Sequence, residues 1–466
     1  GSEITLYIKE DTENENFTEF LDQYKIKELV KRYSDYIRYP IRMDMEVTKT
    51  VESEDENAEP KYETVIENQT LNSMVPLWHK SSNDVTEEQY ADFYKATFYD
   101  YNAPLKTIQA HIEGTVEYET LMFIPAKAPF DYYSKGYEKG LTLYSNGVMI
   151  MDKCADLLPD YFNFVKGVVD SSDLTLNISR ETLQQNYQLR TIAKSLEKKI
   201  RTELLKLMKE DREKYTAFFK EFGAVLKFGV YNEYGANKDT LKDLLVFKSS
   251  ATDNYISLKE YTDAMPEDQK AIYYASAATE ELAKSLPRTN LVRSKGYDVL
   301  LFTDEVDEFV ATTLMNFGGK DFVNVTSGNL DLSSEDEKES VKTLNEESKE
   351  LLDFMRDVLK GEVKGVRFSN TVGEDPVSLI SEGYLSAEMA RVLSQLPGHE
   401  GMALAQTVLE INMNHKIKDT LKNLFESDKE KLSAYTEILY AQARLISGLE
   451  IKDPVKLSSQ ICDLLV

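Results

Sequence analysis

The chain has 466 residues, of which 42% are hydrophobic and 11% aromatic, and it carries a formal net charge of −26. The length predicts about two to four domains, and the charge argues against a nucleic-acid partner, because a phosphate-binding surface needs a basic stripe. No apolar run reaches the length of a membrane span. The two cysteines, Cys154 and Cys462, exclude a disulfide framework and favour a reducing compartment. The strong acidity repels anionic membranes, so we expect no membrane partner.

The N-terminal part predicts a strand, a helix and a second extended stretch. Residues 3–8 alternate like a strand, residues 18–37 have the spacing of an amphipathic helix, and residues 39–47 are extended again. The acidic run at 52–59 predicts a loop and a domain boundary.

The next part alternates between helices and strands. Residues 86–98 predict a helix capped by Thr86, residues 114–126 alternate like a strand, and Asn146-Gly147 predicts a hairpin between two short strands. We expect residues 151–170 to be mostly helical. From Ser179 a long helical spacing continues to about residue 209, and it is carried by Leu183, Ile192, Leu196, Ile200, Leu204 and Leu207.

A second, smaller α/β part follows a further helix at 212–231. Strands are predicted at 244–250 and 297–303, with helices at 258–263, 266–284 and 305–316. A polar, acidic stretch at 333–340 predicts another boundary.

The C-terminal part predicts mixed α/β structure that closes on two helices. We expect strands at 363–370 and 407–414 and a short helix at 386–396. The first closing helix has a capping box, Ser427 with Glu430, and the second begins with Asp453-Pro454.

Arg180 occupies an unusual position for a cation. Ser179 is a good N-cap, which places Arg180 on the first helical turn, where the helix dipole disfavours a positive charge. Free N–H groups together with a guanidinium suit an anion, and Asn177 and Gln184 lie close enough in sequence to contribute polar contacts. The pattern leaves open an ion pair with a neighbouring carboxylate instead.

Three apolar features also have two interpretations each. Trp78 fits either a partly exposed contact or the core. The helical face of Leu385, Met389, Val392 and Leu393 either packs within its domain or receives apolar partners. The closing helices bury their apolar faces either in their own domain or against a second copy. The four histidines are scattered without a metal-binding spacing, so we predict no metal site.

Several long segments resemble one family. They are "PLWHKSSNDVTEEQYADFYK", "GTVEYETLMFIPAKAPFDYY", "LTLYSNGVMIMD", "LLPDYFNFVKGVVDSSDLTLNISRETLQQN" and "LVRSKGYDVLLFTDEVDEF". Together they resemble the ninety-kilodalton heat-shock chaperone family in its bacterial HtpG form. The resemblance implies a cytosolic, homodimeric molecular chaperone that assists protein folding, takes part in the stress response and hydrolyses ATP. The family's nucleotide-pocket motifs do not occur here, so the resemblance implies that most of the N-terminal nucleotide domain is missing.

The resemblance implies a division of an α/β multidomain chain. It places the end of the nucleotide domain at 1–47, an acidic linker at 48–70, a large middle-domain part at 71–225, a smaller part at 226–332 and a dimerisation domain at 333–466. It implies that Arg180, with Gln184 and Asn177, reaches the γ-phosphate of ATP. ATP and Mg²⁺ are expected in the full-length protein, and neither is expected on this chain, which has no autonomous ATPase activity in this interpretation.

The resemblance also implies two kinds of protein contact. Unfolded or partly folded clients are expected at Trp78, Phe309, Leu385, Met389, Val392 and Leu393. The homodimer is expected to bury Leu432, Tyr435, Ile438, Leu439, Leu445, Ile461, Leu464 and Leu465. The alternative function, which needs no ATP, is a scaffold or adaptor that binds partners through its acidic α/β domains.

Overall fold

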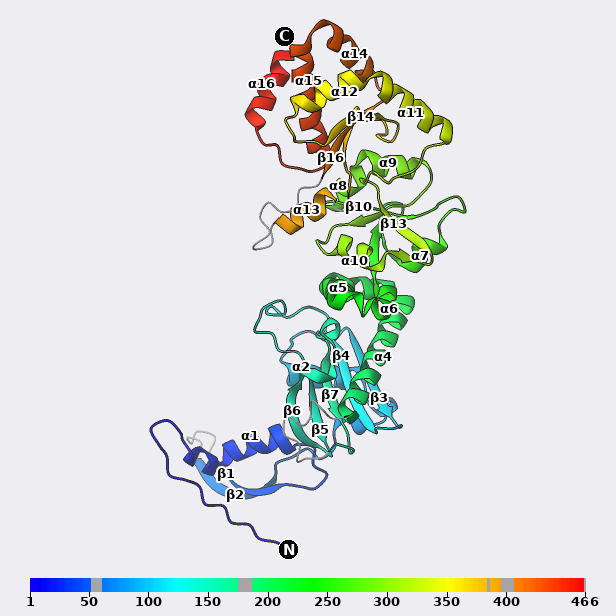
Figure 1. Ribbon diagram of the computed structural model, residues 1–466. Helices are drawn as coiled ribbons and strands as arrows, with labels where there is room; N and C mark the ends of the chain where they lie inside the picture. The colour runs from blue at the N-terminus through cyan, green and yellow to red at the C-terminus, as the bar shows by residue number, and fades with distance from the viewer. Residues whose placement is uncertain (52–60, 175–186, 384–385, 395–405, 465–466) are drawn as a thin grey trace. The chain divides into compact units, whose positions relative to one another are not determined.

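The computed structural model describes residues 1–51, 61–174, 187–383, 386–394 and 406–464 (Figure 1). The chain forms two compact units, Gly1–Phe222 and Gly223–Val466, which are described separately below. Both units mix helices and sheets, which confirms the predicted α/β multidomain class. The predicted division into five segments is finer than these two units and stays a prediction.

The first unit begins with a helix beside a two-stranded hairpin (Figure 1). The elements are η1 (Thr18–Leu21), α1 (Gln23–Ser34), β1 (Arg42–Val51) and β2 (Lys61–Thr70). Asp22 separates η1 from α1 because its side chain caps α1 by accepting a hydrogen bond from the Lys25 amide at 2.9 Å. Much of the stretch 48–70 that we predicted as a linker is therefore paired strand, while the acidic run at 52–59 lies outside the described residues.

The strand predicted at residues 3–8 is wrong. These residues have no regular structure, and Leu6 is 83% exposed. An alternating pattern forms a strand only where a neighbouring strand supplies hydrogen bonds, and none of the described strands pairs with this stretch.

A five-stranded sheet forms the core of the first unit. Its order is β3-β4-β7-β5-β6, with β5 and β7 parallel and the other pairs antiparallel. The strands are β3 (Lys106–Ile112), β4 (Tyr118–Ile124), β5 (Leu141–Ser145), β6 (Val148–Cys154) and β7 (Lys166–Asp170). The predicted hairpin is confirmed, since Asn146 and Gly147 have φ values of 51° and 77° between β5 and β6.

Short helices and α2 flank this sheet. They are η2 (Leu77–His79), η3 (Ser82–Asp84), α2 (Glu87–Phe98), η4 (Ala155–Leu157) and η5 (Asp160–Phe162). The predicted cap of α2 is confirmed, because Thr86 and Gln89 exchange hydrogen bonds in a capping box. The prediction that 151–170 is mostly helical is wrong. This stretch holds the end of β6, η4, η5 and β7, and four of the five residues of β7 are buried, so no alternation marked it as a strand.

Two long helices follow, α4 (Tyr187–Glu210) and α5 (Arg212–Gly235). The helical spacing predicted for α4 is confirmed, because Ile192, Leu196, Ile200, Leu204 and Leu207 are all buried. Leu183 lies outside the described residues. Helical geometry in α5 is interrupted at Asn232, Glu233 and Tyr234.

The second unit begins within α5, at Gly223, and continues with a six-stranded sheet in the order β12-β13-β10-β11-β8-β9. The strands are β8 (Val246–Ser249), β9 (Tyr255–Ser257), β10 (Ile272–Ser276), β11 (Leu300–Phe302), β12 (Asn316–Phe317) and β13 (Lys320–Asn324). The helices are α6 (Lys238–Leu241), η6 (Lys242–Leu244), α7 (Leu258–Asp263), α8 (Glu280–Ser285), α9 (Pro287–Ser294) and α10 (Asp307–Leu314). The helix predicted at 266–284 is wrong over β10, a buried strand between two parallel neighbours, which shows no polar alternation.

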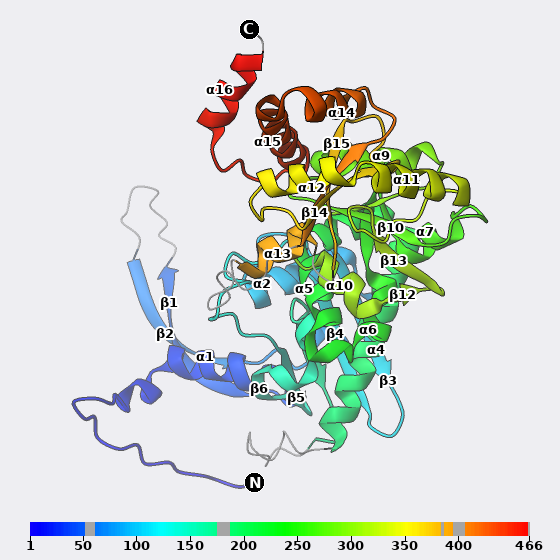
Figure 2. The same cartoon turned by 45° about the horizontal axis from the view of Figure 1, so that its top comes forward.

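A three-stranded sheet and its helices complete the second unit (Figure 2). The order is β14-β16-β15, from β14 (Gly365–Ser369), β15 (Val377–Ser381) and β16 (Thr407–Asn412). The helices are α11 (Glu335–Glu347), α12 (Lys349–Val358), α13 (Ala387–Ser394), α14 (Ile417–Ser427), α15 (Lys429–Ile446) and α16 (Pro454–Leu464). One apolar cluster joins this sheet to α12, α14 and α15.

One sequence expectation changes at the helix ends of this part. Asp428 caps α15, while Ser427, the predicted cap, is the last residue of α14. The acidic stretch 333–340, which was predicted as a boundary, is helical over most of its length, because Ser334 and Glu337 form a capping box that starts α11. The predicted start of α16 is confirmed, since the Asp453 carboxylate accepts a hydrogen bond from the Lys456 amide at 2.9 Å.

Candidate functional site

The predicted catalytic residues Arg180, Asn177 and Gln184 lie outside the described residues. The structure describes the chain up to Leu174 on one side of them and from Tyr187 on the other. The stretch that leaves β7 is tied to the sheet: Ser171 Oγ donates to the Glu117 carbonyl at 2.6 Å, and Ser145 Oγ donates to the Leu174 carbonyl at 2.5 Å. The described chain before the predicted site is thus fixed by its neighbours, and the role of Arg180 stays a prediction.

Trp78 belongs to the core, which corrects its assignment to client binding. It is 2% exposed and packs against Tyr36 and Tyr144, with ring centroids 4.7 and 5.2 Å away. Its indole Nε1–H donates to Asp170 Oδ2 at 3.3 Å. A side chain so enclosed has no area left for a client, so Trp78 supports the end of β7 instead.

The second predicted client residue, Phe309, lies on α10 in the second unit. Its ring is half-buried against Tyr231, with centroids 5.3 Å apart. The start of α10 is held by Lys227, whose ammonium group lies 2.7 Å from Asp304 and 2.6 Å from Asp307. Burial lowers the pKa of the Lys227 ammonium, but these two carboxylates outweigh it and keep the pKa raised.

The predicted client face on α13 is turned inward in this conformation. Met389 and Val392 are 8% and 9% exposed, and Leu393 is half-buried, while Leu385 lies outside the described residues. The core alternative therefore describes this conformation of α13, and client binding at these residues requires α13 to move.

Ser386 connects the start of α13 to α10. Its Oγ accepts a hydrogen bond from the Met389 amide at 2.9 Å and donates to Glu308 Oε1 at 2.6 Å, while Asn324 donates to Glu308 Oε2 at 3.2 Å. Burial raises the pKa of the Glu308 carboxyl in spite of these donors. The three side chains border a cavity of about 190 Å³ that Arg391 also lines.

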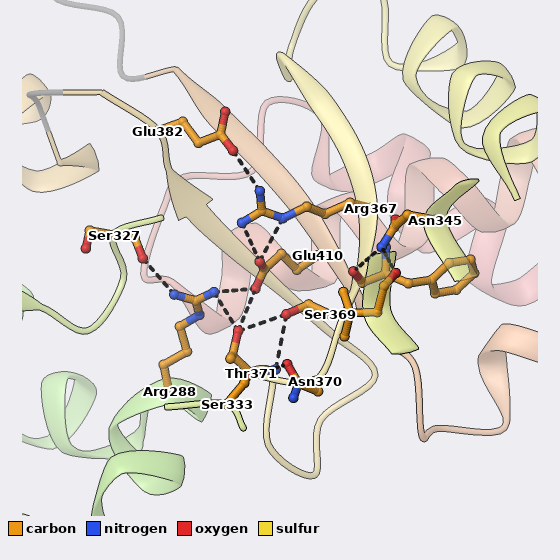
Figure 3. Close-up of polar contacts among 12 residues, drawn as sticks. Arg288, Ser327, Ser333, Asn345, Arg367, Ser369, Asn370, Thr371, Glu382 and Glu410 are labelled. Carbon is orange, nitrogen blue, oxygen red and sulfur yellow. Dashed lines mark hydrogen bonds and ion pairs between the residues drawn. The ribbon is translucent and has the colours of Figure 1, made fainter. Parts of the chain in front are cut away.

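Among the described residues of the second unit, the most buried ion pair joins α9 to the three-stranded sheet (Figure 3). Arg288, 3% exposed, lies 2.6 Å from Glu410 of β16 and also donates to Thr371 and to the carbonyls of Val325 and Ser327. Arg367 binds the other oxygen of Glu410 at 2.9 Å. Arg288 and Glu410 are 122 positions apart, so no local sequence pattern could have revealed the pair.

The predicted dimer residues divide into core and surface positions. Leu432 and Leu439 belong to the apolar cluster of their own domain, so their assignment to a dimer interface is wrong. Leu445 and Ile461 are 57% and 42% exposed, and Tyr435 and Ile438 are half-buried. No side-chain position is described for Leu464, and Leu465 lies outside the described residues.

The described ranges hold no group of three or more histidine, cysteine, aspartate or glutamate residues that could bind a metal ion. None of the helices in the described parts of the chain is long and apolar enough to cross a membrane.

Comparison with known proteins agrees with the resemblance seen in the sequence. The model of the family described as Hsp90 protein matches residues 19–64 and 60–466. Chaperone protein HtpG of Bacillus subtilis (strain 168) is 48% identical over 466 residues, which are 100% of this chain and 74% of that protein. The proteins of the same name from Oceanobacillus iheyensis and from Clostridium botulinum (strain Loch Maree / Type A3) are 49% identical, again over 100% of this chain and 74% of their own length. The chain therefore belongs to the Hsp90 family of chaperones.

Proposed function

We propose that this chaperone acts as a cytoplasmic homodimer that binds unfolded or partly folded client proteins in a cycle driven by ATP and Mg²⁺. The observation that carries the proposal is the 48–49% identity, over the whole chain, to proteins named Chaperone protein HtpG. Such identity over both units leaves the scaffold alternative without a specific observation in its favour.

In this proposal Arg180, with Asn177 and Gln184, contacts the γ-phosphate of ATP held by a nucleotide domain of the family. A guanidinium at a helix start is costly without an anion and favourable with one. The anchored chain between Asp170 and Leu174 supports this role, because a rigid approach reduces the entropy lost on phosphate contact.

Client binding is tested most directly by suppression of aggregation. A chemically denatured model enzyme is diluted into buffer with this protein or with an equal mass of serum albumin, and light scattering is followed. We expect the protein to lower the scattering well below the albumin control. Equal scattering in both samples contradicts client binding.

The role of Arg180 is tested in a chimera that places the nucleotide domain of the Bacillus subtilis relative before residue 1. Arg180→Ala is expected to remove most ATP turnover while nucleotide binding and dimer mass stay unchanged. Arg190→Ala, on the described part of α4 ten positions further on, is the matched control. Unchanged turnover in Arg180→Ala favours the scaffold alternative.

A further inference from the structure

Two of the four histidines meet at one carboxylate in the first unit, although they are 32 positions apart in the sequence. His111 lies on β3, and His79 ends η2. Both approach Glu119 of β4: His111 Nδ1 lies 3.0 Å from Oε1, and His79 Nε2 lies 3.3 Å from Oε2. The sequence showed these histidines as unrelated residues.

The strand register explains the meeting. His111 pairs with Glu119 across β3 and β4, and Glu119 pairs with Asp170 across β4 and β7. Residues directly opposite each other in neighbouring strands share one face of a sheet, so the three form a row across it. His79 lies against this row, since its Nε2 is also 3.2 Å from Asp170 Oδ2.

The geometry of His111 selects its charged form. Nδ1 faces Glu119, and Nε2 lies 3.1 Å from Glu113 Oε1. An ionised carboxylate only accepts hydrogen bonds, and a neutral imidazole has a single N–H, so both contacts are hydrogen bonds only when the ring carries two protons. A neutral ring instead turns one lone pair towards a carboxylate oxygen.

His79 is also surrounded by negative charge, with Nε2 between the carboxylates of Glu119 and Asp170. Its hydrogen bond to Asp170 raises the pKa of His79, and burial opposes this rise only in part. The hydrogen bond to Glu113 likewise raises the pKa of His111. Among the described residues, the carboxylates in contact with the two rings are Glu119 from β4, Asp170 from β7 and Glu113 after β3.

We propose that His79 and His111 bind Glu119 from two sides in their protonated forms, and that His79 is thereby a positioning residue for Asp170 and the chain that leaves β7. Asp170 also accepts the indole N–H of Trp78, and it directly precedes Ser171, which is hydrogen-bonded to the carbonyls of Tyr144 and Glu117. Loss of the His79 proton leaves Asp170 and Glu119 facing each other without a cation between them. A link between His79 and ATP turnover rests on the proposed function, in which Arg180, ten positions after Asp170, contacts the γ-phosphate.

The four histidines make a direct test possible by NMR titration of the imidazole rings in the whole chain. His79→Gln and His111→Gln assign the two signals. Both midpoints are expected above the ordinary histidine value of about 6.5. Glu119→Gln is expected to lower both midpoints together, and Asp170→Asn is expected to lower that of His79 alone. A Glu119→Gln variant that leaves either midpoint unchanged overturns the proposal.

The positioning role has its own measurement, which does not depend on ATP. The Ser171 amide donates to the Tyr144 carbonyl at 3.2 Å. Its hydrogen-exchange rate is measured at pH values below and above the His79 midpoint, and each rate is compared with the intrinsic rate at that pH. Protection is expected to fall above the midpoint and to lose this pH dependence in His79→Gln. Protection in His79→Gln that follows pH as in the unsubstituted protein contradicts the role.

His415→Gln is the matched control, because the His415 Nδ1 accepts the Ile417 amide at 3.1 Å and lies in the second unit. It is expected to change neither the His79 midpoint nor the Ser171 exchange. In the chimera, the pH profile of ATP turnover should shift in His79→Gln. A chimera without turnover refutes the proposed ATP cycle, while the titration and exchange results still decide the positioning role.

Discussion

Arg288 and Glu410 form a buried ion pair with 2.6 Å between guanidinium nitrogen and carboxylate oxygen, although 122 positions separate them. Their side chains are 4% and 1% exposed, so neither charge is solvated by water. The pair links α9 to β16 and thus joins residues that the sequence assigned to different domains. Backbone hydrogen bonds add to it, since the Ser381 amide donates to the Thr326 carbonyl and the Gly328 amide to the Ser381 carbonyl, both at 3.0 Å.

Arg288→Met is expected to destabilise the second unit by about 3–5 kcal/mol, because it removes one partner of a buried pair and leaves Thr371 and two carbonyls with fewer donors. Lys452→Met is the control, because Lys452 binds Glu362 at 2.6 Å while remaining 68% exposed, and it should cost under about 1 kcal/mol. Guanidinium unfolding of each variant measures both values. Equal losses of unfolding free energy in the two variants contradict the importance of burial at Arg288.

The same pair predicts an acid dependence. Burial raises the pKa of Glu410, but Arg288 and Arg367 outweigh burial and hold the pKa below its ordinary value of 4.5. A lowered folded-state pKa contributes stability that is present above 4.5 and is lost as pH falls through the folded-state value. Unfolding free energies between pH 7 and pH 3 should therefore fall less steeply in Glu410→Gln than in the unsubstituted protein. If the unfolding free energy falls equally steeply with pH in both proteins, the lowered pKa of Glu410 is contradicted.

Lys227→Met is expected to cost about 3–5 kcal/mol in the second unit, because it leaves the Asp307 carboxylate, 2% exposed, without its cation. The double variant Lys227→Met with Asp307→Asn should recover part of this loss, since the amide carries no charge and its oxygen can still accept from the Thr303 amide. A double variant that is less stable than Lys227→Met shows that Asp307 acts mainly through its hydrogen bonds.

Gly147→Ala should be more costly than Gly296→Ala, although both glycines have positive φ. A Cβ at Gly147 lies 2.3 Å from the Tyr36 carbonyl oxygen, whereas a Cβ at Gly296, with φ +85°, meets nothing within 4 Å. Both alanines lose the left-handed preference of glycine, at about 1 kcal/mol each, so the difference between them isolates the clash with Tyr36. The difference is measured from the thermal unfolding of the unit that contains each residue. Equal decreases in unfolding temperature in the two variants argue against close contact at Tyr36.

Ile461→Asp is expected to shift the proposed homodimer towards monomers without unfolding the chain. Ile461 is 42% exposed on α16, so a charge there costs little in the monomer but much in an apolar interface. Ser459→Asp, an exposed position on the same helix, adds the same charge without removing an apolar side chain. Sedimentation equilibrium gives the mass of each variant, and a dimer in Ile461→Asp excludes this surface.

Elements with a local signal were predictable from the sequence. The Asn146-Gly147 turn, the Thr86 capping box and the apolar spacing of α4 each depend on residues within a few positions of one another. Strands β7 and β10 were missed because they are buried inside sheets, where both faces are apolar and no alternation remains. The strand predicted at 3–8 is the opposite case, because its residues alternate but none of the described strands pairs with them.

By itself, the sequence determined the α/β class and many helices, since these follow from residue types and short spacings along the chain. The family came from the resemblance of several long segments to its members. Only the tertiary structure decided that Trp78 and Leu432 belong to the core, that Met389 faces inward in this conformation, and that His79 and His111 share Glu119. These facts depend on strand register and on packing between distant segments. A one-residue change in register turns a side chain to the other face of a sheet, and no local pattern records which distant segment lies opposite.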